Sequence, residues 1–144
     1  MKKRSLNNKG FSLIELLIVV AIIGVLGAIG VPMYVGYVSQ AQITDAQNTM
    51  QAIYMVQEEY KSTNSSNAHY TTTAGATCSP ALAQHTNINT NLFGGKEQLK
   101  TSGSKFLFCI AGGAGSDGGY KIFTERDGGT DAMTLNANNA KTGW

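Results

Sequence analysis

Glu15 is the most unusual chemical group in the sequence, because it is a carboxylate at the start of a long apolar run. Residues 16–38 contain no charged side chain and no Ser, Thr, Asn or Gln. An ionised carboxylate is costly inside a membrane, although less so near the membrane surface. A group with such a cost usually serves a function, so Glu15 is the first candidate functional residue.

A second chemical signal lies at residues 113–118, Gly-Ala-Gly-Ser-Asp-Gly, which fit the dinucleotide-binding pattern G-x-G-x-x-G. That pattern requires a helix directly afterwards, because the helix N-terminus holds the pyrophosphate. Residues 120–124 instead have the composition of a β-strand, so we expect a hairpin loop and no cofactor. Since no Ser, His and acid set and no paired carboxylates are recognisable either, nothing in the sequence supports an enzyme.

The candidate metal ligands are both histidines of the chain and three aspartates. His69 and His85 have no Cys or carboxylate at zinc-like spacing, and we expect both to be solvated loop residues. Asp117, Asp127 and Asp131 could contribute to a calcium site, but aspartates flanked by Gly are common in turns. The sequence therefore predicts no metal site.

Several basic side chains could form a surface for DNA, with Tyr120 or Phe123 nearby to stack on bases. These basic residues are Lys96, Lys100, Lys105, Lys121 and Arg126. Acidic residues are interleaved with them, namely Glu97, Asp117, Glu125 and Asp127. We therefore expect an ordinary solvated surface, and DNA is an alternative partner without positive support.

The apolar run is expected to form a helix that crosses a membrane. At 1.5 Å per residue, residues 16–38 make a helix about 35 Å long, which is enough to cross a bilayer. Of the 11 basic residues, those at positions 2, 3, 4 and 9 precede the run, so the positive-inside rule places Met1 in the cytoplasm. The net charge of +2 belongs to this N-terminus, because 7 basic (11 − 4) and 9 acidic side chains follow Gly10.

Residues 9–24, Lys-Gly-Phe-Ser-Leu-Ile-Glu-Leu-Leu-Ile-Val-Val-Ala-Ile-Ile-Gly, resemble the class III signal of type IV pilins and of the related type II secretion pseudopilins. The resemblance implies that a membrane peptidase cuts after Gly10 and methylates the new amino terminus on Phe11. The short leader and the Phe at the first mature position are more similar to the type IVa subgroup. A secretory signal peptide is the alternative, but the apolar run is longer than usual and no A-x-A cleavage site follows it.

The same resemblance implies a role in assembly for Glu15. After cleavage the Phe11 amine is a cation at the helix N-terminus, and Glu15 lies four residues further along the same face. Where water screens neither group, a charge-assisted pair is much more favourable than two isolated charges. In the family this carboxylate meets the amine of a neighbouring subunit. An intrachain pair that only stabilises the monomer in lipid is the alternative.

Four residues that weaken a helix lie inside the expected one: Gly24, Gly27, Gly30 and Pro32. Glycines spaced by three or four residues allow helices to approach closely in membranes. The resemblance implies a different use, in which the segment from Gly24 to Pro32 loses helicity when the subunit leaves the bilayer for the fibre. We expect this partial melting, with close packing as the alternative.

Beyond the apolar run, the helix is expected to continue from Pro32 to about Ser62. Apolar residues recur there at steps of three and four, with Gln57 completing the row; they are Ile43, Ala46, Met50, Ile53 and Tyr60. A stripe of this kind packs against a sheet. The segment from Thr63 to Phe93 has weak periodicity and is rich in Thr, Asn, Ala and Ser, so we expect a loop.

Three short antiparallel strands are predicted after this loop, at Lys105–Ile110, Tyr120–Thr124 and Ala132–Asn136. Within them Leu107 and Cys109 are expected to face the helix, with Ile122 as a further candidate. The predicted fold class is α+β. It consists of a long N-terminal helix whose outer half packs on a small antiparallel sheet, as in the type IV pilin fold.

Cys78 and Cys109 are the only cysteines, and export to an oxidising compartment favours a disulfide between them. Such a bridge would stabilise the exported part by roughly 3.5 kcal/mol on the loop-entropy account. In the common pilin arrangement both cysteines lie near the C-terminus and enclose a variable loop. Because this chain departs from that arrangement, the family's receptor-binding loop is not transferred to it.

The sequence thus predicts a cleaved cytoplasmic leader at residues 1–10, a transmembrane and polymerisation helix at 11–38, and a periplasmic or extracellular head at 39–144. The expected function is that of a non-enzymatic type IV pilus subunit, polymerised from the inner membrane into an extracellular fibre for adhesion, twitching motility or DNA uptake. Implied partners are other copies of the chain, the inner membrane, prepilin peptidase and the pilus assembly platform. A pseudopilin of a type II secretion or competence machine and a signal-anchored extracytoplasmic binding domain are the alternatives.

Overall fold

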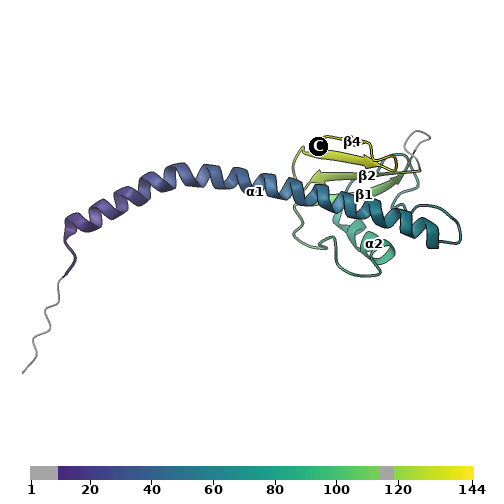
Figure 1. The fold of residues 1–144 in the computed structure, drawn as a ribbon, viewed down its shortest axis with the longest axis horizontal. Helices are drawn as coiled ribbons and strands as arrows, with labels where there is room; N and C mark the ends of the chain where they lie inside the picture. The colour runs from purple at the N-terminus through teal and green to yellow at the C-terminus, as the bar shows by residue number, and fades with distance from the viewer. Residues whose placement is uncertain (1–9, 114–118) are drawn as a thin grey trace, which may run out of the picture. The chain divides into compact units, whose positions relative to one another are not determined.

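The computed structural model describes residues 10–113 and 119–144. The elements along the chain are α1 (Leu13–Thr63), α2 (Leu82–Leu92), β1 (Phe106–Gly112), β2 (Tyr120–Arg126), β3 (Ala132–Asn136) and β4 (Lys141–Thr142) (Figure 1). The chain divides into two compact units, Met1–Gln40 and Ala41–Trp144, and the boundary falls within α1. Most of the expected leader, and most of the glycine-rich loop with Asp117, lie outside the described residues.

In the first unit, α1 is helical without interruption from Leu13 to Gln40. Pro32 has no N–H to donate to the carbonyl of Ala28, yet the helix continues through it. The segment from Gly24 to Pro32 is therefore helical in the single chain, and its melting in a fibre stays a prediction. All side chains from Phe11 to Val38 are exposed.

In the second unit, the remainder of α1 buries the stripe that the sequence predicts. Met50 and Ile53 are 0% exposed, and Ala46 and Gln57 are also buried. Ile43 and Tyr60, the two ends of the stripe, are partly buried against the same core. The helical period of three and four residues therefore predicted the buried face of this half correctly.

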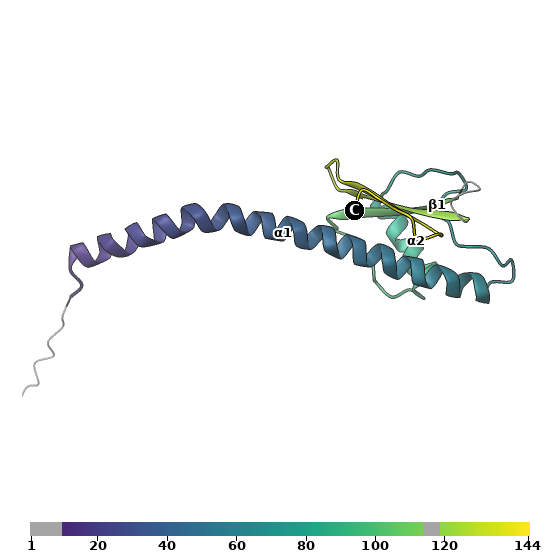
Figure 2. The ribbon, with the colours of Figure 1, turned by 45° about the horizontal axis from the view of Figure 1, so that its top comes forward.

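The sheet has the strand order β1-β2-β3-β4, and every neighbouring pair is antiparallel. Ile110, Ile122 and Leu135 lie opposite one another on successive strands, and each is 0% exposed. Figures 1 and 2 show α1 and α2 on the same face of the sheet. The core of the second unit lies between this face and the two helices.

The prediction that Leu107 and Cys109 face the helix is wrong. The core positions of β1 are the alternate set, Phe106, Phe108 and Ile110. A shift of one residue exchanges the two faces of a strand, and this strand is apolar at consecutive positions. Alternation between apolar and polar residues therefore did not distinguish the two faces, whereas the prediction for Ile122 was correct.

The prediction of a loop from Thr63 to Phe93 is also wrong in part, because α2 lies within it. The helix is rich in Thr and Asn, which are weak helix formers, so local propensity does not predict it. Its buried residues recur at steps of three, one and three and form one face: His85, Ile88, Asn89 and Leu92. Packing of that face on the core stabilises α2 in place of intrinsic propensity.

The predicted disulfide between Cys78 and Cys109 is present. It joins the segment before α2 to the middle of β1. The same segment runs along the outer edge of β1, where Thr73 forms a parallel bridge with Ala111. Cys109 is 0% exposed although it points away from the core, which is consistent with this covering segment.

Candidate functional site

Glu15 is part of the cap that begins α1. The carbonyl of Ser12, the residue before the helix, accepts hydrogen bonds from the N–H groups of Glu15 (3.1 Å) and Leu16 (3.2 Å). The Glu15 carboxylate accepts one from the Ser12 N–H at 2.9 Å. Ser followed three residues later by Glu is the capping-box pattern, which marks the start of a helix in the sequence itself. The helix dipole stabilises a carboxylate at this position.

The cap holds the carboxylate close to the predicted new amino terminus. Phe11 directly precedes Ser12 and is 85% exposed. A positive charge on the Phe11 nitrogen would thus lie one residue before the N–H that binds Glu15. The arrangement can stabilise a cation at the start of α1, whether it belongs to the same copy or to another one.

The residues that follow Glu15 form a continuous exposed apolar surface. Among the described residues, every exposed large apolar side chain other than Met55 and Trp144 lies between Phe11 and Val38. By length and composition alone, α1 is able to cross a membrane. Soluble single chains rarely expose an apolar surface of this extent, so this half of α1 needs an apolar environment outside its own chain.

The glycines of this half are not required by contacts within the chain. A Cβ atom added at Gly24, Gly27 or Gly30 would meet no atom within 4 Å. The missing side chains therefore act in one of two ways. They lower the stability of the helix, or they allow another molecule to approach the backbone closely.

His85 is not the solvated loop residue that the sequence predicted, because it is a fully buried residue of α2. Its Nδ1 lies 2.7 Å from the Lys100 carbonyl oxygen, and its Nε2 lies 3.0 Å from the Phe108 nitrogen. Since a backbone N–H can only donate, Nε2 accepts and Nδ1 carries the proton. Burial lowers the pKa of His85 below its ordinary value, and the hydrogen bond to Lys100 opposes this in part.

His69 is also not solvated, since its side chain is only 8% exposed. Its Nε2 lies 3.1 Å from a Glu58 carboxylate oxygen, and its ring centroid lies 4.7 Å from that of Tyr120. Tyr120 is 0% exposed, and burial, followed by the nearby Glu58 charge, raises the pKa of its hydroxyl. Because the partner of His69 comes from α1, sequence spacing around the histidine could not reveal this contact.

Two buried amides hold loops against the helices, and neither had a role predicted from the sequence. Gln57 on α1 donates to the Tyr70 carbonyl (2.8 Å) and accepts from the Tyr70 N–H (2.9 Å). Asn89 on α2 donates to the Leu99 carbonyl (2.7 Å) and accepts from the Leu99 N–H (2.9 Å). Each amide pairs with the backbone as a neighbouring strand would, and Asn89 Oδ1 also accepts from the Gln98 N–H at 3.2 Å. A lone amide within an apolar stripe was the available signal for Gln57.

Of the two candidate residues for stacking on DNA bases, Tyr120 is buried and not accessible. Phe123 is partly buried, and the Lys121 ammonium lies 5.8 Å from its ring centroid. Arg126 donates to Asp131 at 2.7 Å and to Gln42 at 3.0 Å, and its guanidinium lies 4.9 Å from the ring centroid of Phe106. Asp131 therefore binds a side chain of its own head. Within residues 10–113 and 119–144 there is no group of three or more His, Cys, Asp or Glu that could hold a metal ion.

Part of the chain is similar to known proteins. Residues 5–31 match the prokaryotic N-terminal methylation motif. The type IV major pilin protein PilA of Myxococcus xanthus is 42% identical over 53 residues, which are 37% of this chain and 24% of that protein. A fimbrial protein of Pseudomonas aeruginosa is 53% identical over 45 residues, 31% of this chain and 29% of that protein.

The type IV major fimbrial protein FimA of Dichelobacter nodosus is 58% identical over 36 residues, 25% of this chain and 23% of that protein. The chain therefore spans about a quarter of the length of these relatives. No solved structure matches the chain significantly. The matched motif at residues 5–31 includes the cap and much of the apolar half of α1.

The fold of the second unit is a separate observation that agrees with these matches. A long helix packs on a four-stranded antiparallel sheet, and a disulfide closes the segment between them, which is a pilin-like α+β fold. Pilins are structural proteins rather than enzymes. The chain thus carries the N-terminal methylation motif, is similar in part to type IV pilins and fimbrial proteins, and has a pilin-like α+β fold.

Proposed function

We propose that the chain is made as an inner-membrane precursor and is polymerised into an extracellular pilus fibre. The observation that carries this proposal is the contrast between exposed apolar residues up to Val38 and a head that buries its own core. A helix that is apolar on all sides is stable in a bilayer before assembly and among other copies after it. Its partners are then the inner membrane, other copies of the chain, prepilin peptidase and the pilus assembly platform.

Processing divides the chain into a leader at residues 1–10, a membrane and polymerisation helix at 11–38, and an extracytoplasmic head at 39–144. Cleavage follows Gly10, and Phe11 becomes the N-methylated terminus. The matched motif at residues 5–31 supports this division because it includes both residues. The mature side chains then carry 7 basic and 9 acidic charges, so the cations that orient the precursor are discarded with the leader.

Glu15 pairs in this account with the Phe11 amine of a neighbouring subunit. Its position at the N-terminus of α1, within the cap formed with Ser12, supports the pairing because the carboxylate lies where a terminal amine would be. Between apolar helices, both charges are stabilised only when a new subunit seats at the matching height. The pair therefore fixes the register of the fibre, while burial of apolar surface supplies most of the attraction.

The segment from Gly24 to Pro32 loses helicity on entry into the fibre. Each Gly lowers helix stability by about 0.8–1 kcal/mol relative to Ala, and Pro removes one hydrogen bond. No contact within the chain requires glycine at these positions, which supports a role outside the isolated subunit. Close approach between helices is the alternative use of the same residues.

Mass spectrometry of the mature protein tests the processing step. A mature chain that begins at methylated Phe11 supports the proposal. Two results contradict it: a start beyond Val31, as expected of a secretory signal peptide, and retention of Met1, as expected of a signal-anchored binding domain.

A pseudopilin of a type II secretion or competence machine would share this processing, so a deletion strain must separate the two. If the deletion strain loses surface fibres and also loses adhesion, twitching motility or DNA uptake, the chain is a pilus subunit. The activity that is lost then shows which use the fibre has. Loss of secretion with fibres intact supports the pseudopilin.

A further inference from the structure

His85 joins three segments of the head that are distant in the sequence. It lies on α2, its Nδ1–H donates to the Lys100 carbonyl at 2.7 Å, and its Nε2 accepts from the Phe108 N–H of β1 at 3.0 Å. The ring is 0% exposed and its centroid lies 5.6 Å from that of Phe108. Both nitrogens therefore have defined partners, and this hydrogen-bond pattern exists only in the neutral Nδ1–H tautomer.

Protonation of His85 is incompatible with this arrangement. A proton on Nε2 would face the Phe108 N–H, so two donors would meet and the β1 amide would lose its acceptor. The imidazolium charge would also be buried, which is costly without a carboxylate to pair with it. Within the described residues, no acidic side chain lies within hydrogen-bond distance of the ring.

The charged groups near His85 do not make its protonation more favourable. α2 carries no other titratable side chain, and the only one on β1, Cys109, is held in the disulfide. On the segment that His85 binds, the Glu97 carboxylate accepts from the Thr101 N–H (3.0 Å) and hydroxyl (2.9 Å). The other charged side chains on this segment and on the facing part of α1 are Lys96, Lys100, Lys105 and Asp45.

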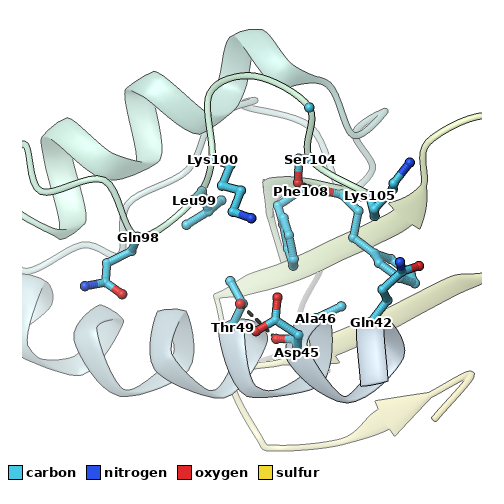
Figure 3. Close-up of a pocket in the computed structure, with 12 residues that line it drawn as sticks. Gln42, Asp45, Ala46, Thr49, Gln98, Leu99, Lys100, Ser104, Lys105 and Phe108 are labelled. Carbon is cyan, nitrogen blue, oxygen red and sulfur yellow. Dashed lines mark hydrogen bonds between the residues drawn. The ribbon is translucent and has the colours of Figure 1, made fainter. Parts of the chain in front are cut away.

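The segment held by His85 forms one wall of a cavity of about 470 Å³. α1 forms the opposite wall, and Phe106 and Phe108 of β1 also line it. Figure 3 shows Lys100 reaching into the cavity from the segment and Asp45 reaching into it from α1. Asn89 holds the same segment through Leu99, one helical turn after His85. The shape of the cavity therefore depends on how firmly α2 holds residues 98–100.

We propose that His85 is an acid-sensitive clamp on this cavity wall. In its neutral form it fixes the wall to α2 and β1, and its protonation releases the wall and opens the cavity. Because a fibre subunit is exposed to the medium, external acid would reach this clamp. The proposal does not depend on assembly, since every group in it belongs to the head.

The pH range in which the clamp opens follows from the direction in which the pKa of His85 is shifted. Burial lowers the pKa of His85, so the open head takes up a proton more readily than the closed one. The closed state then loses stability as the pH falls below about 6.5, until the pH reaches the lowered pKa. One proton changes the opening equilibrium by at most about tenfold per pH unit. Carboxylates act at lower pH, below about 4.5.

The test uses the full chain in detergent micelles, with ¹⁵N-labelled histidine for NMR and with hydrogen exchange at the Leu99 and Phe108 amides. Exchange rates are corrected for their intrinsic pH dependence between pH 7.5 and 5. We expect an unprotonated Nε2 on His85 at pH 7.5. Below about pH 6.5, protection of both amides should fall by up to about tenfold per pH unit.

Two variants assign the response to His85. His69→Gln leaves His85 as the only histidine of the chain and should keep the pH response, whereas His85→Gln should abolish it. If His85→Gln does not fold, the His69→Gln chain decides alone, because the His85 titration midpoint must coincide with the loss of protection. A protonated Nε2 at pH 7.5, a response that persists in His85→Gln, or protection that does not follow the His85 titration overturns the proposal.

Discussion

The two halves of α1 differ in whether their apolar side chains are buried within the chain. Before Gln40, isoleucines such as Ile23 (63%) and Ile29 (61%) are exposed, whereas Ile53 after Ala41 is 0% exposed. The first half is apolar on all sides, and the second is apolar on one stripe that matches one face of the sheet. The second half therefore completes its packing within the chain, and the first half needs partners that this chain does not supply.

The polar groups of the two halves of α1 also differ in their surroundings. In the second half, Gln57 sits inside the core because the Tyr70 backbone satisfies both ends of its amide. Among the described residues, no buried side-chain nitrogen or oxygen atom is left without a hydrogen-bond partner. In the first half Glu15 is the one charged residue between Phe11 and Val38, and it lies at the helix N-terminus. The head thus satisfies its own buried polar groups, whereas Glu15 is the group to which we assign the pairing between subunits.

The largest expected effect comes from removing the disulfide, which belongs to the head alone. The double variant Cys78→Ser with Cys109→Ser opens a connection across 31 residues. It should lower the free energy of unfolding of the head by about 3.5 kcal/mol, because the unfolded chain gains entropy. Chemical denaturation in micelles measures the loss, and membrane insertion should be unchanged. Equal midpoints with and without the bridge would contradict the prediction.

A matched pair of substitutions compares the two halves directly. Ile53→Ala should destabilise the head by about 3 kcal/mol, because it leaves a cavity in the core. Ile29→Ala removes the same atoms from an exposed position and should leave the unfolding of the head unchanged. Denaturation curves of both variants under identical conditions provide the measurement. A similar loss in both would mean that the first half also packs within the chain.

The buried amide offers a third comparison, on neighbouring turns of one helix. Gln57→Ala leaves the Tyr70 N–H and carbonyl without their partner and should cost about 1–3 kcal/mol. Gln51→Ala, at a position only partly buried, should change stability by less than about 0.5 kcal/mol. Thermal unfolding of the two variants tests this difference. A smaller loss for Gln57→Ala than for Gln51→Ala would show that the amide pair is not stabilising.

The smallest expected effect concerns the glycines. Gly27→Ala stabilises the helix by about 1 kcal/mol, so it should make melting between Gly24 and Pro32 about fivefold less favourable and slow fibre formation. Gly36→Ala gives the same helix gain outside that segment, and neither site contacts other atoms of the chain. The rate of fibre regrowth after shearing measures the effect. Equal rates would favour close packing over melting.

Strong local patterns in the sequence predicted much of this structure. The unbroken apolar run and the buried stripe predicted both halves of α1, and short apolar runs predicted β1, β2 and β3 to within a few residues. The disulfide was predictable because the chain has only two cysteines. The capping box at Ser12 and Glu15 was visible as well, but Glu15 was interpreted only through assembly.

What the sequence did not predict depends on contacts between distant residues. α2 is stabilised by its buried face, although Thr and Asn are weak helix formers. The face of β1 was ambiguous because consecutive apolar residues carry no alternation. β4, at Lys141–Thr142, is too short to have a pattern of its own. His85 has its partners on Lys100 and Phe108, so no local spacing could show that it is buried.

Electron microscopy of fibres from a fourth matched pair of variants tests most directly the claim that the N-terminal half of α1 assembles the fibre. Glu15→Leu removes the carboxylate of the first half of α1. Glu59→Leu removes an exposed carboxylate of the second half, which packs in the head. We predict that Glu15→Leu accumulates in the membrane without forming fibres, while Glu59→Leu forms normal fibres. Normal fibres from Glu15→Leu would contradict the account, as would an equal loss of fibres in both variants.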